Sequence, residues 1–350
     1  MRFGTFFLPG PTEVHPFVMA AMSQPMIAHR GPETAAIFEA VQPVLRELFG
    51  TAHEVAIGVC SSTGMMEAGL RLLPPGRLLS LVNGAFSERY AQIAEACGFD
   101  VERFEVAWGE VHDPDAVRSR LRNHVAVTVV HSETSTGALQ PIDDLRGAAG
   151  GVPLIVDSVS GVGGTPFSFD AWDLGYACTG SQKALALPPG IAFGVASPAL
   201  LARPPRPHGF YLDLRNCLGQ QPPFTPALPQ MYALRAQVER IAMEGLAARL
   251  ARHAAMAERT REWARGHPAL RILARDGFRS PTVTAFLLPA GKVSGPLVRA
   301  IAKRGFTVAT GYGKLKDSSF RIGHMGDQDL ATLLPLLAAC DEALKECGFG

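Results

Sequence analysis

Short apolar runs alternate with segments of helical periodicity along the first two-thirds of the chain. The apolar runs that predict strands are residues 55–60, 77–84, 124–131, 152–158 and 191–197. The segments that predict helices between them are residues 65–73, 87–98 and 142–150. Strands that are apolar on both faces and are separated by helices are typical of a mostly parallel sheet covered on both sides. The pattern therefore predicts an α/β fold.

The pattern changes after a proline-rich break at residues 222–229. We expect one long amphipathic helix from about residue 230 to residue 265, followed by the shorter strands and helices of a small α+β domain. A chain of 350 residues is long enough for two domains. We predict an N-terminal arm at residues 1–14, a large domain at residues 15–250 and a small C-terminal domain at residues 251–350.

Polar and aromatic residues gather where the expected strands end. These clusters are SSTGM (61–65), NGAF (83–86), SETSTG (132–137), Asp157 with Ser158, and SQK (181–183). In open α/β sheets, ligands bind at the carboxyl ends of the strands. We therefore expect a ligand site at this edge of the sheet.

Charge and cysteine usage exclude several classes of partner. The formal net charge is +1 with acids and bases mixed along the chain, so a nucleic acid is not an expected partner. The six cysteines are scattered without a CxxC pair, which argues against a zinc site and favours reduced thiols in the cytoplasm. The chain has no signal-peptide pattern and no run of 18 apolar residues, so we expect no membrane span. Because no histidine cluster stands beside the scattered cysteines, we also expect no bound metal.

Lys183 is the only lysine before residue 292, in a chain that has 27 arginines and six lysines. A lysine amine can lose its proton and attack a carbonyl, whereas a guanidinium stays charged. Lys183 is therefore a candidate for Schiff-base chemistry. The alternative is a single surviving surface lysine in an arginine-rich chain.

Two other clusters suggest groups that bind an anion and a ring nitrogen. Ser61, Ser62 and Thr63 at a helix start offer hydroxyls and free N–H groups to a phosphate, or they form an ordinary helix cap. The segment matches neither a Walker loop nor a GxGxxG fingerprint. Asp157 ends an apolar strand, where it needs a partner such as a protonated ring nitrogen, a helix N-terminus or an arginine.

Phe86 and Arg321 complete the candidate set. Phe86 follows a strand and could stack on a flat ligand or belong to the core. Arg321 lies between apolar residues, where its guanidinium could bind a carboxylate ligand or form a structural ion pair. An amine, an anion cup, a carboxylate, a ring and a guanidinium together match pyridoxal 5′-phosphate (PLP) and an amino-acid substrate.

The order of these motifs resembles that of the class V aminotransferases. The motifs that carry the resemblance are LPGPTEV, SSTGMMEAGL, VNGAFSER, VVHSETSTGALQPID, VDSVSGVGG, TGSQKALALPPG and FRIGHMG, with Asp157 26 residues before Lys183. They run nearly from end to end of the chain and are most similar to the alanine–glyoxylate, serine–pyruvate and ureidoglycine–glyoxylate group. The resemblance implies the PLP-dependent transferase fold of type I.

The resemblance also implies a role for each candidate around the cofactor ring. Lys183 holds PLP as a Schiff base and moves the proton of the substrate, and Asp157 pairs with the pyridine nitrogen. Phe86 stacks on one face of the ring, Val159 packs on the other, and Thr134 lies near the ring hydroxyl.

The remaining roles concern the phosphate and the substrate. The resemblance implies that the phosphate is surrounded by Ser61, Ser62, Thr63 and Gln182. Thr225 matches a threonine that reaches the phosphate of the neighbouring subunit, which implies a homodimer, and Arg321 matches the arginine that binds the substrate α-carboxylate. The chain departs from the family at Pro222, where relatives often have a tyrosine, and at Ser62, where they often have a glycine.

The activity implied is transfer of an amino group from a small amino acid, of alanine or serine type, to a 2-oxo acid such as glyoxylate or pyruvate by a ping-pong mechanism. SETSTG and SPTVTAF are also similar to 2-aminoethylphosphonate–pyruvate transaminase, which is the main alternative. A PLP-dependent lyase or desulfurase and a PLP-binding protein without turnover are further alternatives. The identity of the donor is not readable from these motifs.

Overall fold

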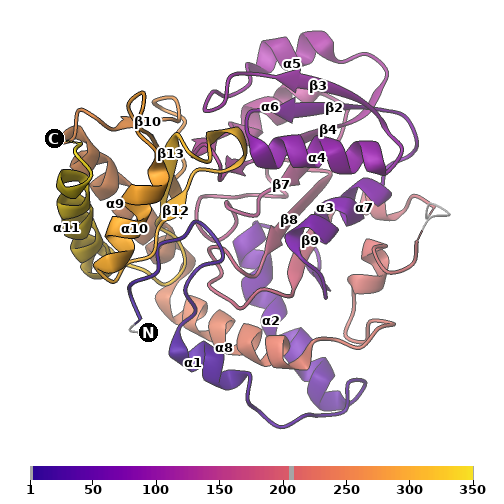
Figure 1. Cartoon of the computed structure of the whole chain (residues 1–350). Helices are drawn as coiled ribbons and strands as arrows, with labels where there is room; N and C mark the ends of the chain where they lie inside the picture. The colour runs from indigo at the N-terminus through magenta and orange to yellow at the C-terminus, as the bar shows by residue number, and fades with distance from the viewer. Residues whose placement is uncertain (1–2, 205–208, 350) are drawn as a thin grey trace.

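A seven-stranded sheet forms the centre of the computed structural model, which describes residues 3–204 and 209–349 (Figure 1). Its strands are, in spatial order, β1 (Ala56–Gly58), β9 (Ala192–Ala196), β8 (Tyr176–Gly180), β7 (Leu154–Asp157), β4 (His124–Val130), β2 (Arg77–Val82) and β3 (Asp100–Glu105). Strand β9 is antiparallel to both of its neighbours, and the other pairs are parallel. The prediction of a mostly parallel sheet is confirmed.

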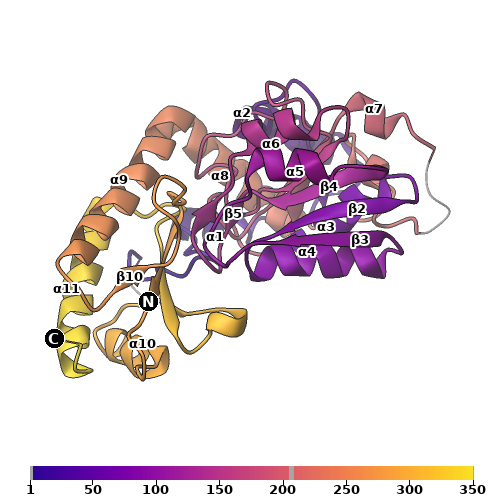
Figure 2. The same cartoon turned by 90° about the horizontal axis from the view of Figure 1, so that it is seen from above.

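Helices cover both faces of this sheet. Helices α3 (Ser62–Arg71) and α4 (Ala85–Ala96) lie on one face, as Figure 2 shows, and α2 (Pro32–Phe49), α5 (Pro114–Arg120), α6 (Ile142–Ala149) and α8 (Leu228–Glu244) lie on the other. The remaining short elements are α1 (Pro16–Ala21), α7 (Pro198–Leu201), β5 (Ser132–Glu133), β6 (Ala138–Leu139) and a 3₁₀ turn at Leu214–Cys217. Each face therefore buries its own apolar core.

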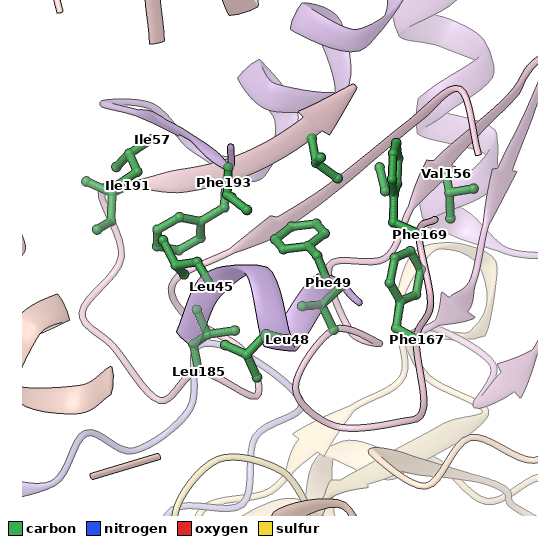
Figure 3. Close-up of a cluster of buried hydrophobic side chains, with 14 of the residues drawn as sticks. Leu45, Leu48, Phe49, Ile57, Val156, Phe167, Phe169, Leu185, Ile191 and Phe193 are labelled. Atoms are coloured by element: carbon green, nitrogen blue, oxygen red, sulfur yellow. The ribbon is translucent and has the colours of Figure 1, made fainter. Parts of the chain in front are cut away.

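The core beneath α2 reaches the candidate lysine segment. It contains Leu45, Leu48 and Phe49 of α2, which pack with Phe193 of β9 (Figure 3). Leu185, which follows the predicted site lysine by two positions, is fully buried in the same cluster. Deletion of one large side chain from such a core costs about 2–5 kcal/mol, so this packing fixes the backbone beside the site.

Two strands of the sheet, β3 and β8, are not predicted by the sequence pattern. Strand β3 lies at the sheet edge, and its residues DVERFE are exposed or half-buried, so the charged positions hide the strand pattern. Strand β8 has the sequence YACTG, which is fully buried but too short and too rich in small residues to stand out. Tertiary packing, rather than local preference, makes both segments strands.

The predicted single helix over residues 230–265 is wrong. The chain forms α8, which ends at Glu244, and then α9 (Leu246–Arg265). Gly245 between them has φ +80° and ψ 137°, a conformation far from helical that only glycine adopts readily.

A second sheet of four strands lies apart from the first, in the order β10 (Arg271–Ile272), β11 (Val283–Leu287), β13 (Ser319–Gly323) and β12 (Ala309–Thr310). All of its pairs are antiparallel, and it shares a core with α9, α10 (Ser294–Lys303) and α11 (Leu330–Glu346). The N-terminal segment joins this core through Phe7. The limits of the arm and the two domains stay a prediction, and their end residues 1, 2 and 350 lie outside the described residues.

Candidate active site

A cavity of about 250 Å³ lies where β4 and β7 end and where α3 and α4 begin. The structure brings nine of the predicted site residues to its wall: Ser61, Ser62, Thr63, Phe86, Thr134, Asp157, Val159, Gln182 and Lys183. A larger hollow of about 610 Å³ beside α2 is more open, and its charged residues are exposed or half-buried. Buried titratable side chains converge on the smaller cavity, which we take as the candidate site.

The amine of Lys183 is buried and held in place. Only 7% of the residue is exposed, and Nζ donates a hydrogen bond to the Pro9 carbonyl oxygen at 2.5 Å. Burial, followed by the charge of Arg321, lowers the pKa of Lys183 to about 8. A substantial fraction of the amine is therefore neutral near pH 8, as a nucleophile or a proton acceptor must be.

The segment before α1 crosses directly over Lys183. Thr12 donates from its backbone N–H to the Gln182 carbonyl at 3.0 Å and from Oγ1 to the Lys183 carbonyl at 2.9 Å. Gly10 has φ +118°, and a Cβ there would lie 2.5 Å from Lys183 Nζ. Glycine is favoured at this position because φ +118° strains any other residue and because an added Cβ would displace the Lys183 side chain.

Asp157 ends β7 with its carboxyl group buried. Its Oδ1 accepts a hydrogen bond from Val159 N–H at 2.8 Å, and burial raises the pKa of Asp157 to about 6. Oδ2 has no hydrogen-bond partner within the described part of the chain. A protonated ring nitrogen in the cavity fits this unpaired acceptor, because it would stabilise the carboxylate that burial of the residue disfavours.

The start of α3 has the properties of an anion cup. Ser61 is the N-cap residue, but its side chain makes no capping hydrogen bond, so the simple cap is not what the structure contains. Gln182 Nε2 donates to Ser62 Oγ at 3.2 Å, which places a side chain from the lysine loop beside the cup. The free N–H groups and hydroxyls fit a phosphate at a helix N-terminus.

Arg321 lies beside the cavity rather than on its wall. Nε donates to the Thr310 carbonyl at 3.0 Å and Nη1 to the Thr134 carbonyl at 3.2 Å, and burial lowers the pKa of Arg321 to about 10. No carboxylate lies within 4.0 Å of its guanidinium among the residues that the structure describes. The guanidinium is therefore fixed by carbonyl groups without a directly paired carboxylate, although the charge of Glu133 acts on it through space, and it can accept a substrate carboxylate.

Thr225 lies elsewhere. It is exposed and does not line the cavity of its own chain. Its role at a neighbouring subunit stays a prediction.

The cavity wall also contains residues that we did not predict individually as site residues: Met66, Arg89, Val130, Ser132 and Ser160. Arg89 follows Phe86 by three positions on α4, so the helical spacing could have placed the two side chains on one face. Ser160 Oγ is 2.5 Å from Thr134 Oγ1 and fixes that hydroxyl. Ser160 had no comparable signal, because its approach depends on how the loop after β7 folds back.

Glu133 is a buried carboxylate of the SETSTG cluster, for which the sequence predicted no individual role. It is fully buried and accepts hydrogen bonds from the N–H groups of Phe86, Ser87 and Ser135, at 3.1, 2.9 and 3.1 Å. Two of these donors belong to the first turn of α4, where a negative charge is stabilised by the helix. Glu133 therefore fixes the start of the helix that bears Phe86 and Arg89.

Comparisons with known proteins agree with this fold and site. The profile of the family Aminotransferase class-V matches residues 12–313. The chain is 32% identical to the serine–glyoxylate aminotransferase of Methylorubrum extorquens, over 98% of this chain and 91% of that protein. Its structure superimposes with a TM-score of 0.91 on an aspartate aminotransferase of subgroup IV from Thermus thermophilus, at 33% identity and covering 98% and 99% of the two chains.

A further structural relative is the alanine–glyoxylate aminotransferase of Nostoc sp., with a TM-score of 0.90, 29% identity and coverage of 97% and 95%. The fold and the buried lysine cavity define a PLP-dependent transferase of fold type I. The chain belongs to the class-V aminotransferase family. The predictions of the fold class and of a PLP-dependent transaminase are confirmed.

No helix within residues 3–204 and 209–349 is long and apolar enough to cross a membrane. No group of three or more His, Cys, Asp or Glu side chains in the same ranges is arranged to hold a metal ion.

Proposed function

We propose that this enzyme transfers the amino group of a small amino acid, of alanine or serine type, to glyoxylate or pyruvate by a ping-pong mechanism. The single observation that carries this proposal is the buried amine of Lys183, which lines the same cavity as Asp157. Burial lowers the pKa of this amine to about 8. The named activities of the serine–glyoxylate and alanine–glyoxylate relatives support the choice of substrates.

The cavity has a place for each part of PLP. Lys183 would hold the aldehyde carbon, Asp157 Oδ2 the ring nitrogen, and Phe86 and Val159 the two faces of the ring. The residues that would hold the phosphate are Ser61, Ser62, Thr63 and Gln182. When bound, PLP supplies a carbonyl carbon that links covalently to amines and a ring that withdraws electrons from the substrate Cα.

The residues of the chain bind the donor and move its proton. Arg321 binds the α-carboxylate, because its guanidinium is held by two carbonyl groups without a carboxylate partner. Lys183 Nζ accepts a proton in its neutral form and returns it in its charged form, and Pro9 O keeps the amine oriented. Asp157 in its ionised form keeps the ring nitrogen protonated.

We also infer a cytoplasmic homodimer in which Thr225 reaches the phosphate of the partner site. Thr225 is exposed, and the nearby Phe210 and Tyr211 are 65% and 45% exposed. Exposed aromatic side chains beside a polar contact residue favour a protein interface. The six free cysteines support a reducing compartment.

The test is a half-reaction panel. PLP-loaded enzyme is mixed separately with alanine, serine and 2-aminoethylphosphonate, and the absorbance of the lysine-bound cofactor is followed. We expect alanine or serine to abolish this absorbance, and Lys183→Arg to abolish the response. A response to aminoethylphosphonate alone would favour the phosphonate transaminase, and no response to any donor would refute the proposal.

A further inference from the structure

Arg89 places a guanidinium on the cavity wall, and it forms no ion pair with any residue that the structure describes. Its guanidinium carbon lies 5.0 Å from the centre of the Phe86 ring, and Nη2 donates to Tyr312 Oη at 2.7 Å. Its position contrasts with Arg103, which is paired with Glu95 at 2.9 Å. Arg89 has no carboxylate within 4.0 Å in the described part of the chain. Asp157 acts on this charge only through space, so a half-buried guanidinium that faces a cavity without a paired carboxylate is available to an anionic ligand.

Arg89 belongs to the substrate end of the cavity. Tyr312 stacks on Phe86 with a ring separation of 5.2 Å and an angle of 16°. The guanidinium carbons of Arg89 and Arg321 lie 6.0 and 5.7 Å from the centre of the same Tyr312 ring. Arg89 therefore shares a neighbour with the arginine that takes the α-carboxylate, whereas the phosphate cup lies at the start of a different helix, α3.

Tyr312 keeps Arg89 in this position. It precedes the short 3₁₀ turn Gly313–Leu315, which links β12 to β13. The same turn is held against the large sheet, because Lys314 Nζ lies 4.2 Å from the centre of the Trp108 ring. The Tyr312 hydroxyl, which accepts a hydrogen bond from Arg89, thus comes from a segment that also contacts Trp108.

We propose that Arg89, oriented by Tyr312, is a second anion subsite that extends the donor class to amino dicarboxylic acids. This inference rests on the proposed function, because it assumes that Arg321 binds the α-carboxylate. Because the guanidinium groups of Arg321 and Arg89 both lie against the Tyr312 ring, a donor whose α-carboxylate is bound by Arg321 would present a second carboxylate to Arg89. An alanine-sized donor leaves Arg89 to water, so Arg89 selects among donors without being needed for the proton transfer.

The test measures binding without turnover. The dissociation constants of succinate, with two carboxylates, and of propionate, with one, are determined by calorimetry on the PLP-loaded enzyme. Wild type is compared with Arg89→Gln, Arg89→Lys and Tyr312→Phe, and with Arg103→Gln as a control at a paired surface arginine. A hydrogen bond between charged groups contributes enough to change affinity about 10- to 100-fold.

We expect Arg89→Gln to weaken the binding of succinate by about 10-fold or more and to leave the binding of propionate unchanged. Arg89→Lys and Tyr312→Phe should weaken succinate binding less. The kcat/KM for aspartate relative to alanine should fall in the same order. An unchanged ratio of succinate to propionate affinity, or an equal loss for both, would overturn the subsite. If Arg89→Gln fails to fold, Tyr312→Phe carries the same comparison.

The two proposals fail separately. If wild type does not respond to alanine or serine in the half-reaction panel, the proposed function falls whatever Arg89 does. If alanine reacts normally and the selectivity for dicarboxylates does not depend on Arg89, only the second subsite falls.

Discussion

At the scale of single residues, burial moves two titratable groups of the site toward their neutral forms. Burial lowers the pKa of Lys183 to about 8 and raises the pKa of Asp157 to about 6. A neutral amine is what carbonyl chemistry needs, and a carboxyl group that burial destabilises gains most from a cationic partner. The site without cofactor is therefore arranged to favour binding of an aldehyde that has a protonated ring.

The lowered pKa of Lys183 predicts the pH dependence of cofactor uptake. Because the neutral amine reacts, the rate at which cofactor-free enzyme binds PLP should rise with pH and level off above about pH 8. Stopped-flow absorbance measures this rate. A rate that keeps rising with pH up to about 10.5, the ordinary pKa of a lysine, would contradict the environment that we describe for Lys183.

The raised pKa of Asp157 predicts a change in stability with pH. The folded protein binds this proton more tightly than the unfolded chain, so the contribution of Asp157 to stability is lost as the pH rises from about 4 to above 6. In cofactor-free enzyme, Asp157→Asn should therefore gain roughly 2 kcal/mol in free energy of unfolding relative to wild type between pH 4 and pH 7. Urea unfolding at the two pH values measures the gain, and a constant difference between the proteins would argue against it.

The sequence allowed most single site residues to be named, because each chemical group has few substitutes. Only lysine forms the covalent link, so Lys183 was identifiable from its rarity and its motif. Arg89 and Tyr312 were not predicted: the spacing of Arg89 from Phe86 indicates a shared helix face but not a cavity, and Tyr312 is 223 positions from Arg89 in the sequence. Such contacts are decided by the packing of the two sheets.

At the scale of elements, the segment after β8 is fixed from the side of α9. Arg249 at the start of α9 is 1% exposed, and its Nη2 donates to the Ala184 carbonyl at 2.6 Å and to Asp327 at 3.0 Å. Gln237 of α8 donates to the Leu185 carbonyl at 2.9 Å. The junction of α8 and α9 thus holds the two residues that follow the site lysine. The hydrophobic pattern predicts one helix here because apolar periodicity continues through Gly245. A hydrophobic pattern carries no information about the backbone angles of this glycine.

The break at Gly245 predicts the sign of two glycine substitutions. Gly245→Ala should lower the free energy of unfolding by about 1–3 kcal/mol, because alanine disfavours φ +80° with ψ 137°. Gly147→Ala is the matched control within α6, where nothing lies within 4 Å of the added Cβ, and it should raise stability by about 0.5–1 kcal/mol. Denaturant unfolding measures both. Equal effects of the two changes would show that Gly245 is not under conformational constraint.

At the scale of the whole molecule, the candidate site combines residues that both sheets position. Asp157 ends β7 and Lys183 lies in the turn after β8 of the seven-stranded sheet, whereas Arg321, beside the cavity, comes from β13 of the four-stranded sheet. The Arg321 guanidinium reaches the Thr134 carbonyl at 3.2 Å, and the N-terminal segment brings Pro9 O to Lys183. Parallel-sheet topology and motif order made the large sheet predictable, whereas the approach of the second sheet follows from contacts that no local pattern encodes.

The predicted homodimer implies that the affinity for PLP depends on protein concentration. If Thr225 completes the phosphate site of the partner, dilution that separates the subunits should weaken PLP binding. Sedimentation velocity and cofactor fluorescence at matched concentrations test this, and Thr225→Ala should reduce both the affinity and its dependence on dilution. A protein that stays at 37.3 kDa at all concentrations and still binds PLP tightly would contradict the shared site.

The central claim is that one amine, that of Lys183, carries the cofactor. The most direct measurement is borohydride reduction of the PLP-loaded enzyme followed by digestion and peptide mass spectrometry. The account predicts one pyridoxyl group per chain, on the peptide that contains Lys183. A pyridoxyl group fixed instead on one of the lysines at 292, 303, 314, 316 or 345, or on none, would contradict it.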